Sequence, residues 1–330
     1  MKVFVSRKIP QMGIDLLLHE GISPVIWNED RLMTQGELIE NAKKTDALLC
    51  MSSDKIDKFF LNECKHLKVI SQYSVGYDNV DVAESIALGI PIGNTPDVLS
   101  DATADVAFTL MLSVARRAFY MHKRIINGEW SFSRPTVNLG IELKNKTLGI
   151  FGLGRIGIEM AKRCKGADNM NIIYCNPSSK PFAEDQLKAK KVSFDELLIQ
   201  SDIVSVHCAL TAETKEKFDL SAFRKMKKTA IFINTARGVI HNELDLIKAL
   251  QTGIIWGAGL DVTNPEPMRS DNPLLFMDNA AILPHIGSST VEARNAMAKL
   301  AAENIISGLR GEELPHLVNK GVYDNQPFNE

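Results

Sequence analysis

The chain has 330 residues, enough for about two domains of roughly 150 residues each. Hydrophobic residues make up 45% of the sequence and charged residues 24%, which excludes a disordered or fibrous chain. The formal net charge of −2 gives no electrostatic indication of nucleic-acid binding.

Hydropathy and cysteine usage argue against a secreted or membrane protein. The N-terminus becomes charged too early for a signal peptide, and the longest apolar run, residues 106–115, is half the roughly 20 residues that span a bilayer. The five cysteines are scattered without a C-x-x-C pair, which excludes a disulfide framework or zinc ribbon. We therefore expect a cytoplasmic protein with no metal site and no membrane contact.

Short apolar runs alternate with amphipathic segments along the whole chain. They predict strands at residues 2–6, 24–27, 47–50 and 68–71, and helices at 12–19, 35–43 and 55–64. A second series follows the Gly- and Pro-bearing stretch 128–140, with strands at 147–151, 171–175, 203–207, 229–233, 256–261 and 281–283, and helices at 156–164, 194–199 and 244–252. Strict βα alternation predicts an α/β protein with parallel sheets covered by helices.

Two longer segments, 102–122 and 290–309, are expected to be long helices. The first is apolar on more than one face and the second is rich in alanine. Either helix could cross between domains or subunits, and either could equally be an ordinary core helix.

The first strand of the second series runs into Gly152-Leu-Gly154-Arg155-Ile156-Gly157, a G-x-G-x-x-G pattern that opens a predicted helix. Gly152 permits the tight turn, Gly154 lets the backbone approach a pyrophosphate, and Gly157 lets helix and strand pack closely. The phosphates would then face the unpaired N–H groups of the helix start. This context predicts a dinucleotide cradle.

The next predicted strand ends at Asn176, 19 residues after Gly157. An acidic residue there would bind the ribose hydroxyls and repel a 2′-phosphate, but asparagine is neutral. Ser178, Ser179 and Lys180 could bind such a phosphate. We expect NADP(H) to be preferred, whereas NAD(H) is possible if Asn176 holds the ribose diol.

Arg237, Glu266 and His285 lie at or just beyond the ends of successive predicted strands. The carboxyl ends of parallel strands face the ligand crevice, so these residues should converge there. Arginine can bind a carboxylate and a carbonyl oxygen, a protonated histidine can give its proton to that oxygen, and glutamate can stabilise the imidazolium. Each residue alone could be structural, but together they predict reduction of a 2-keto acid.

The chain resembles the D-isomer-specific 2-hydroxyacid dehydrogenases, and most closely their glyoxylate/hydroxypyruvate reductase branch. The resemblance covers nearly the full length and rests on residues 74–81, 152–157, 207–211, 234–238, 261–267 and 284–287. It implies an enzyme in which Arg237, Glu266 and His285 are catalytic, with hydride from NAD(P)H and a proton from His285. The product would be the D-2-hydroxy acid.

The resemblance also implies binding roles for other residues. Val75 and Gly76 would present backbone N–H groups to the substrate carboxylate, beside Arg237 and the small, neutral segment around Met51; such a turn is also a plausible anion nest. The cofactor contacts would be Thr103, Gly152, Gly154, Arg155, Ile156, Gly157, Asn176, Ser178, Lys180, Cys208, Thr235, Ala236, Asp261 and Gly287.

Two Rossmann-like or flavodoxin-like lobes with a cleft between them are implied in the same way. Residues 1–100 plus 290–330 would form the substrate-binding lobe and 101–289 the dinucleotide-binding lobe, linked by the two long helices. Related enzymes pair through the cofactor lobes, so we expect a homodimer that acts on a small-molecule 2-keto or 2-hydroxy acid.

Two alternatives stay open. The reductase branch often carries an aromatic residue a few positions after Trp130, and Ser133 at that place would open the pocket to a sugar acid such as 2-ketogluconate. The second alternative is a dinucleotide-sensing protein similar to the corepressors that share these motifs. Glyoxylate and hydroxypyruvate rank first.

Overall fold

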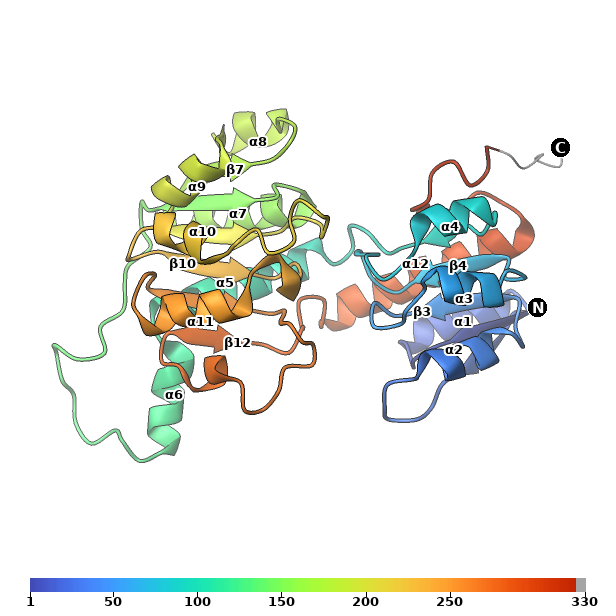
Figure 1. Cartoon of the computed structure of the whole chain (residues 1–330), viewed down its shortest axis with the longest axis horizontal. Coiled ribbons are helices and arrows are strands. Elements are labelled where there is room, and N and C mark those ends of the chain that lie inside the picture. Colours follow the sequence, from blue (N-terminus) through green and yellow to red (C-terminus); the bar gives the residue numbers. More distant parts are fainter. Residues whose placement is uncertain (325–330) are drawn as a thin grey trace. The chain divides into compact units, whose positions relative to one another are not determined.

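The computed structural model describes residues 1–324, which divide into two compact units. Unit 1 comprises Met1–Leu99 and the described part of Ser289–Glu330, and unit 2 comprises Ser100–Ser288. The chain therefore starts unit 1, builds all of unit 2 and then returns to unit 1, as the colours of Figure 1 show.

Unit 1 contains a five-stranded parallel sheet of order β2-β1-β3-β4-β5. Its strands are β1 (Lys2–Val5), β2 (Ser23–Ile26), β3 (Ala47–Cys50), β4 (Val69–Gln72) and β5 (Ile92–Gly93). Its helices are α1 (Gln11–His19), α2 (Gln35–Ala42), α3 (Lys58–Glu63), α4 (Val82–Ala87) and α12 (Val291–Arg310).

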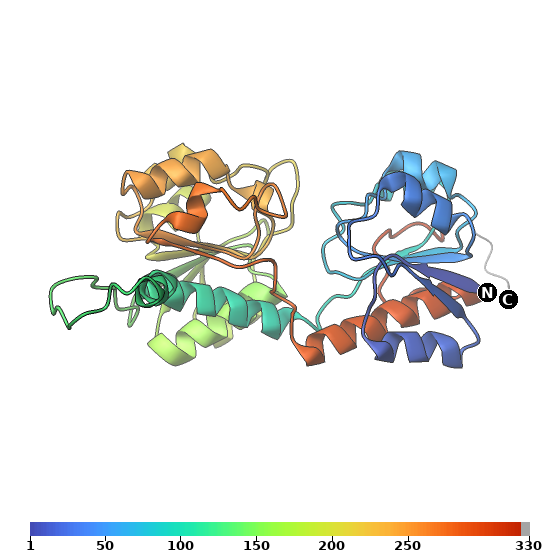
Figure 2. The ribbon, with the colours of Figure 1, turned by 90° about the horizontal axis from the view of Figure 1, so that it is seen from below.

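The returning helix α12 packs against α1 and covers β3 and β4 (Figure 2). Two glycines permit this packing. A Cβ atom on Gly308 would lie 2.5 Å from the side chain of Val69, and one on Gly13 would lie 2.7 Å from the carbonyl oxygen of Ala298. The C-terminal segment is therefore part of the core of unit 1.

Unit 2 contains a seven-stranded parallel sheet of order β12-β11-β10-β9-β6-β7-β8. Its strands are β6 (Thr147–Phe151), β7 (Asn171–Cys175), β8 (Lys190–Lys191), β9 (Ile203–Val206), β10 (Ile231–Asn234), β11 (Gly257–Leu260) and β12 (Ala280–Ile282). Its α-helices are α5 (Ser100–Ala115), α6 (Ala118–Ile126), α7 (Arg155–Asp168), α8 (Pro181–Gln186), α9 (Phe194–Gln200), α10 (Leu220–Lys225) and α11 (Glu243–Gln251), with short 3-10 turns at Gly238–Ile240 and Pro273–Phe276.

The prediction of one helix over residues 102–122 is wrong. The chain leaves the helical conformation at Arg117, whose φ is 51°, and this separates α5 from α6. Two contacts hold Arg117 there. Its guanidinium forms an ion pair with the Asp278 carboxylate at 3.0 Å and lies over the Trp256 ring, 4.9 Å from the ring centroid. As a result α5 packs into the core, whereas α6 buries no residue.

Most other predicted strands and helices agree with the structure to within a few residues, but α4, α8, α10, β5 and β8 were not predicted. Helix α3 begins three residues after the predicted start at residue 55, because the Asp57 carboxylate accepts the N–H of Phe60 at 3.0 Å and caps the helix there. No helix among residues 1–324 combines the length and apolarity needed to cross a membrane.

Candidate active site

The strand order of unit 2 reverses between β6 and β9, and ligands bind at such points in open α/β sheets. Gly152 follows β6 there with a φ of 95°. A Cβ at this position would lie 2.5 Å from the backbone nitrogen of Cys208, which follows β9. Only glycine fits this turn, and the turn brings the predicted contact Cys208 beside the cradle.

Helix α7 starts directly after the turn. Its N-cap is Gly154, which has no side chain to bond the N–H groups of Ile156 and Gly157. A Cβ on Gly154 would meet nothing within 4 Å, and both Gly154 and Arg155 are exposed. An accessible helix start with open space in front of it fits a dinucleotide pyrophosphate.

Asn176 is bonded to the cradle itself. The N–H of Leu153 donates to Asn176 Oδ1 at 2.6 Å, and Asn176 Nδ2 donates to the Leu153 carbonyl at 3.2 Å. Because Leu153 lies between the first two cradle glycines, the Asn176 side chain fixes the turn that would meet the phosphates.

The segment after β7 is exposed at Ser178 and carries positive charge nearby. Lys191 on the edge strand β8 donates to the carbonyl of Pro177 at 2.8 Å, and the backbone N–H of Lys180 donates to the Tyr174 hydroxyl at 2.8 Å. The charge of Lys191 therefore borders this segment, and the Tyr174 hydroxyl that accepts the Lys180 N–H donates in turn to Glu184 Oε1 at 2.5 Å.

Arg237 follows β10 in a turn built by Asn234. The Asn234 amide accepts the N–H of Ala236 at 2.9 Å and donates to the Arg237 carbonyl at 2.8 Å and to His241 Nδ1 at 3.1 Å. Burial lowers the pKa of His241 to about 4, so the ring is neutral and can accept this bond. Asn234 and His241 were not predicted as site residues, although an asparagine at the end of a strand commonly bonds to the backbone two residues on and so indicates a turn.

His207 links the ends of β9 and β10. Its ring is hydrogen-bonded to Ser205 Oγ at 2.8 Å and to Thr235 Oγ1 at 3.3 Å. Burial lowers the pKa of His207 to about 4. The uncharged ring therefore ties the predicted contact Thr235 to the neighbouring strand.

His285 and Glu266 form a hydrogen-bonded pair through His285 Nδ1 and Glu266 Oε1, and each side chain is 40% exposed. Burial opposes the charge on Glu266, but the bond from His285, the charge of His285 and the nearby Arg237 together lower the pKa of the glutamate. Since the charge of Arg237 acts on Glu266, the three predicted catalytic residues lie in one region of unit 2.

Asp261 supports the His285 turn, in which His285 has a φ of 54°. The buried carboxylate accepts the N–H groups of Ile286 at 2.8 Å and Gly287 at 2.7 Å. Burial raises the pKa of Asp261 in spite of these bonds. A Cβ on Gly287 would lie 3.1 Å from Asp261 and 3.2 Å from Thr103, so these three predicted cofactor contacts meet.

The remaining predicted residues, Met51, Val75 and Gly76, lie in unit 1. Val75 and Gly76 are partly exposed in the loop after β4, and Met51 directly follows β3. Asn79 Nδ2 donates to the Met51 carbonyl at 3.3 Å, which connects the two loops. Within residues 1–324 no group of three His, Cys, Asp or Glu side chains could hold a metal ion.

Comparison with known proteins identifies the family. Residues 108–287 match the sequence model of the D-isomer specific 2-hydroxyacid dehydrogenase NAD binding domain. The chain belongs to this family. It is 44% identical to the glyoxylate reductase of Thermococcus litoralis over 99% of both chains.

Solved structures agree with this assignment. The TT0316 protein of Thermus thermophilus has a TM-score of 0.90 and 38% identity, covering 96% of this chain and all of that one. An NADPH-dependent glyoxylate/hydroxypyruvate reductase of Sinorhizobium meliloti, solved with NADP and malonate, has a TM-score of 0.84 and 27% identity, covering 97% of each chain. The predicted family, the α/β fold with two Rossmann-like lobes and the enzymatic class are confirmed. The protein uses a nicotinamide dinucleotide to reduce a 2-keto acid to a hydroxy acid.

Proposed function

We propose that this dehydrogenase reduces glyoxylate to glycolate, which is achiral, and hydroxypyruvate to the D-2-hydroxy acid, with NADPH preferred over NADH. The hydrogen-bonded pair of His285 and Glu266, with the charge of Arg237 beside it, carries the proposal. The 44% identity to a glyoxylate reductase supports the choice of glyoxylate as a substrate.

Each of the three residues has a distinct role in this proposal. Arg237 binds the substrate carboxylate and the adjacent carbonyl oxygen, because its planar fork presents several donors. His285 Nδ1 is occupied by Glu266, so Nε2 is the atom that gives its proton to the carbonyl oxygen. Glu266 stabilises the imidazolium and selects its orientation. The bound cofactor supplies the hydride.

The cofactor is held along the carboxyl edge of the unit 2 sheet in this proposal. The cradle from Gly152 to Gly157 takes the pyrophosphate, and Cys208 lines it through its backbone. The nicotinamide end lies near Thr103, Thr235, Ala236, Asp261 and Gly287. The closeness of both Thr103 and Asp261 to Gly287 supports this placement.

NADPH preference follows from charge. The residue after β7 is Asn176 and not an acidic residue, its amide bonds to Leu153, and Lys191 Nζ donates to the Pro177 carbonyl. Ser178 and Lys180 complete a neutral-to-basic surface that fits a 2′-phosphate. Val75, Gly76 and Met51 of unit 1 bind the substrate in the same proposal, with the carboxylate on the backbone N–H groups.

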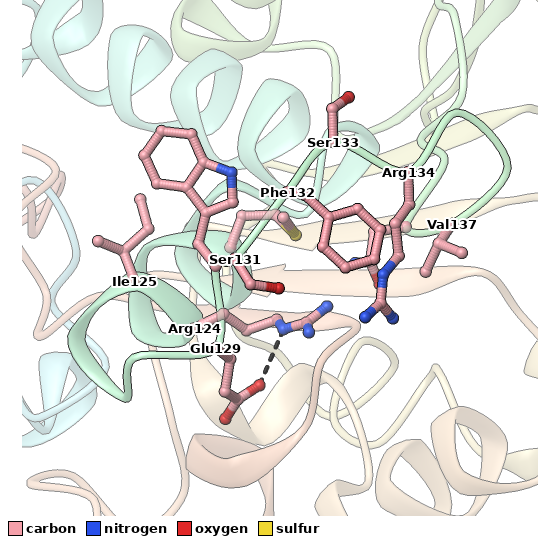
Figure 3. A pocket seen from close by; sticks show the side chains of 11 residues that line it. Arg124, Ile125, Glu129, Ser131, Phe132, Ser133, Arg134 and Val137 are labelled. Carbon is pink, nitrogen blue, oxygen red and sulfur yellow. Dashed lines mark hydrogen bonds and ion pairs between the residues drawn. The ribbon is translucent and has the colours of Figure 1, made fainter.

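We also propose that the protein is a homodimer paired through unit 2. Helix α6 and the loop after it project from this unit (Figure 2), and their pocket of about 370 Å³ is drawn in Figure 3. Four of their apolar side chains are 62% to 73% exposed: Ile126, Trp130, Phe132 and Leu139. A second copy of the chain would cover this apolar surface.

Light scattering tests the dimer. The wild type should have twice the 36.6 kDa chain mass, and the double variant Ile126→Asp, Phe132→Asp should shift toward the monomer. Leu244→Asp, at another exposed apolar residue of unit 2, is the control. A monomeric wild type, or a double variant that stays dimeric, contradicts the proposal.

Steady-state absorbance at the nicotinamide band tests the reaction. Glyoxylate, hydroxypyruvate, 2-ketogluconate and pyruvate are each assayed with NADPH and NADH. The highest kcat/KM is expected for glyoxylate or hydroxypyruvate with NADPH. A higher value for 2-ketogluconate contradicts the substrate proposal, and a higher value with NADH contradicts the cofactor proposal.

A further inference from the structure

In the loop that follows β4, the carbonyl oxygens of three consecutive residues each accept a hydrogen bond. The Ser74 carbonyl accepts the backbone N–H of Thr95 at 3.0 Å, and the Val75 carbonyl accepts Asn94 Nδ2 at 2.8 Å. The Gly76 carbonyl accepts Gln72 Nε2 at 2.7 Å and Ser74 Oγ at 2.6 Å.

In a planar trans peptide, the N–H points opposite to the carbonyl. The bonds to the Ser74 and Val75 carbonyls therefore aim the N–H groups of Val75 and Gly76 away from the segment that carries Asn94. Within residues 1–324 neither N–H group donates a hydrogen bond. Two adjacent, partly exposed N–H groups that donate no other hydrogen bond can bind a carboxylate.

Asn94 is itself anchored by the C-terminal return of the chain. Its N–H donates to the His316 carbonyl at 3.1 Å, and its carbonyl accepts Asn304 Nδ2 at 3.0 Å. Asn304 lies fully buried on α12 and also accepts the N–H of His316 at 3.2 Å. Gly93 makes room for it, since a Cβ there would lie 2.6 Å from Asn304 Cγ.

We propose that Asn94 is a positioning residue for the substrate carboxylate, acting through the Val75 carbonyl that it holds. The bond from Asn94 orients the N–H of Gly76, and Asn304 on α12 keeps Asn94 in place. This inference rests on the proposed binding of the carboxylate at Val75 and Gly76. Neither Asn94 nor Asn304 touches the substrate, so the effect of replacing them appears in substrate affinity.

Two substitutions at Asn94 test the inference. Asn94→Leu removes the donor without adding charge, and Asn94→Asp keeps the shape but places an acceptor against the Val75 carbonyl. Each should raise the KM for glyoxylate about tenfold, the effect of losing one good hydrogen bond, with a smaller change in kcat. The Kd of oxamate, a carboxylate analogue of the substrate, should rise in parallel.

The cofactor provides the internal control, because its cradle lies in unit 2. The Kd of NADPH should change less than about twofold, since no contact of the cradle is altered. Asn28→Asp adds the same charge at an exposed residue of unit 1 and should leave both KM and Kd unchanged. If Asn94→Leu does not fold, Asn94→Ser removes the same bond with a smaller side chain.

Val75→Pro removes one of the two N–H groups and separates the possible results. If Val75→Pro raises the KM but the Asn94 variants keep the wild-type value, the positioning role is refuted and the carboxylate site stands. If all variants keep the wild-type KM, the carboxylate does not bind at Val75 and Gly76. The proposed carboxylate site and the positioning role of Asn94 are then both refuted. If only Asn94→Asp raises the KM, its charge explains the effect and the positioning role is refuted.

Discussion

Asn176 and Leu153 are joined by two hydrogen bonds, one in each direction between the side-chain amide and the Leu153 backbone. The residue that commonly selects the cofactor thus also shapes the loop that would bind the phosphates. Because the Asn176 amide is already hydrogen-bonded to Leu153, discrimination between NADPH and NADH depends on the charge around the end of β7.

Asn176→Asp should reverse that discrimination. The carboxylate can still accept the N–H of Leu153, but its charge would repel a 2′-phosphate. We expect the ratio of kcat/KM for NADPH to that for NADH to fall by about tenfold or more, which corresponds to roughly 1.4 kcal/mol. Asn169→Asp, at an exposed residue of the same unit, is the control. An unchanged ratio would contradict the proposed preference.

Glu266→Gln should alter the pH dependence of keto acid reduction. The pKa of Glu266 is lowered by its pairing with His285, so the carboxylate is ionised across the working range and stabilises the imidazolium. Glutamine carries no charge beside His285, so the pH–rate profile should shift to lower pH. The profile of Glu40→Gln, at an exposed residue of unit 1, should match the wild type. An identical profile for Glu266→Gln would remove Glu266 from the mechanism.

His285→Ala should remove the proton donor. We expect kcat to fall by about 10²–10⁴-fold, the usual contribution of general acid catalysis. Fluorescence titration should give an NADPH Kd close to the wild-type value, because the cradle lies at β6 and α7. A kcat within about threefold of wild type would assign the proton transfer elsewhere.

Arg237→Lys keeps the charge but loses the planar fork of donors. It should raise KM and lower kcat, with kcat/KM reduced by about 100-fold, because lysine cannot bind the carboxylate and the carbonyl oxygen together. Steady-state kinetics with glyoxylate measure both constants. Wild-type kinetics would show that Arg237 does not contact the substrate.

The buried His241 should make unit 2 sensitive to acid. Its pKa falls from the ordinary 6.5 to about 4 on folding, so the unfolded chain binds more protons between these values and stability decreases as the pH falls through them. The cost at pH 5 is about 2 kcal/mol relative to pH 7. Urea unfolding at both pH values should show a correspondingly smaller loss for His241→Phe than for the wild type. An equal loss would mean that the ring takes up a proton in the folded protein.

Much of the fold could be predicted because apolar runs bounded by turn residues define buried parallel strands. The predicted strands 47–50, 147–151 and 171–175 coincide with β3, β6 and β7. The break at Arg117 could not be predicted, because it depends on Asp278 and Trp256, residues far along the chain. The short elements α8 and β8 have too few residues to show a period.

The candidate site also contains residues that the sequence predicts and supporting residues that it does not. The cradle and the trio of Arg237, Glu266 and His285 could be predicted because residue type and strand position indicate the chemistry. The supports were not found, since Asn94 is held by Asn304 and His316 through bonds that span more than two hundred residues of sequence. Periodicity and local motifs contain no information about such distant partners.

The discontinuity of unit 1 has a consequence for biosynthesis. A ribosome completes residues 1–99 and then the whole of unit 2 before it makes α12, the helix that covers β3 and β4. During that interval the apolar face of the sheet in the first segment is uncovered. Asn94, which bonds to the Val75 carbonyl, is not yet held in place by Asn304. Unit 1 therefore cannot complete its core until α12 has been made, whereas unit 2 is encoded by one continuous segment, Ser100–Ser288.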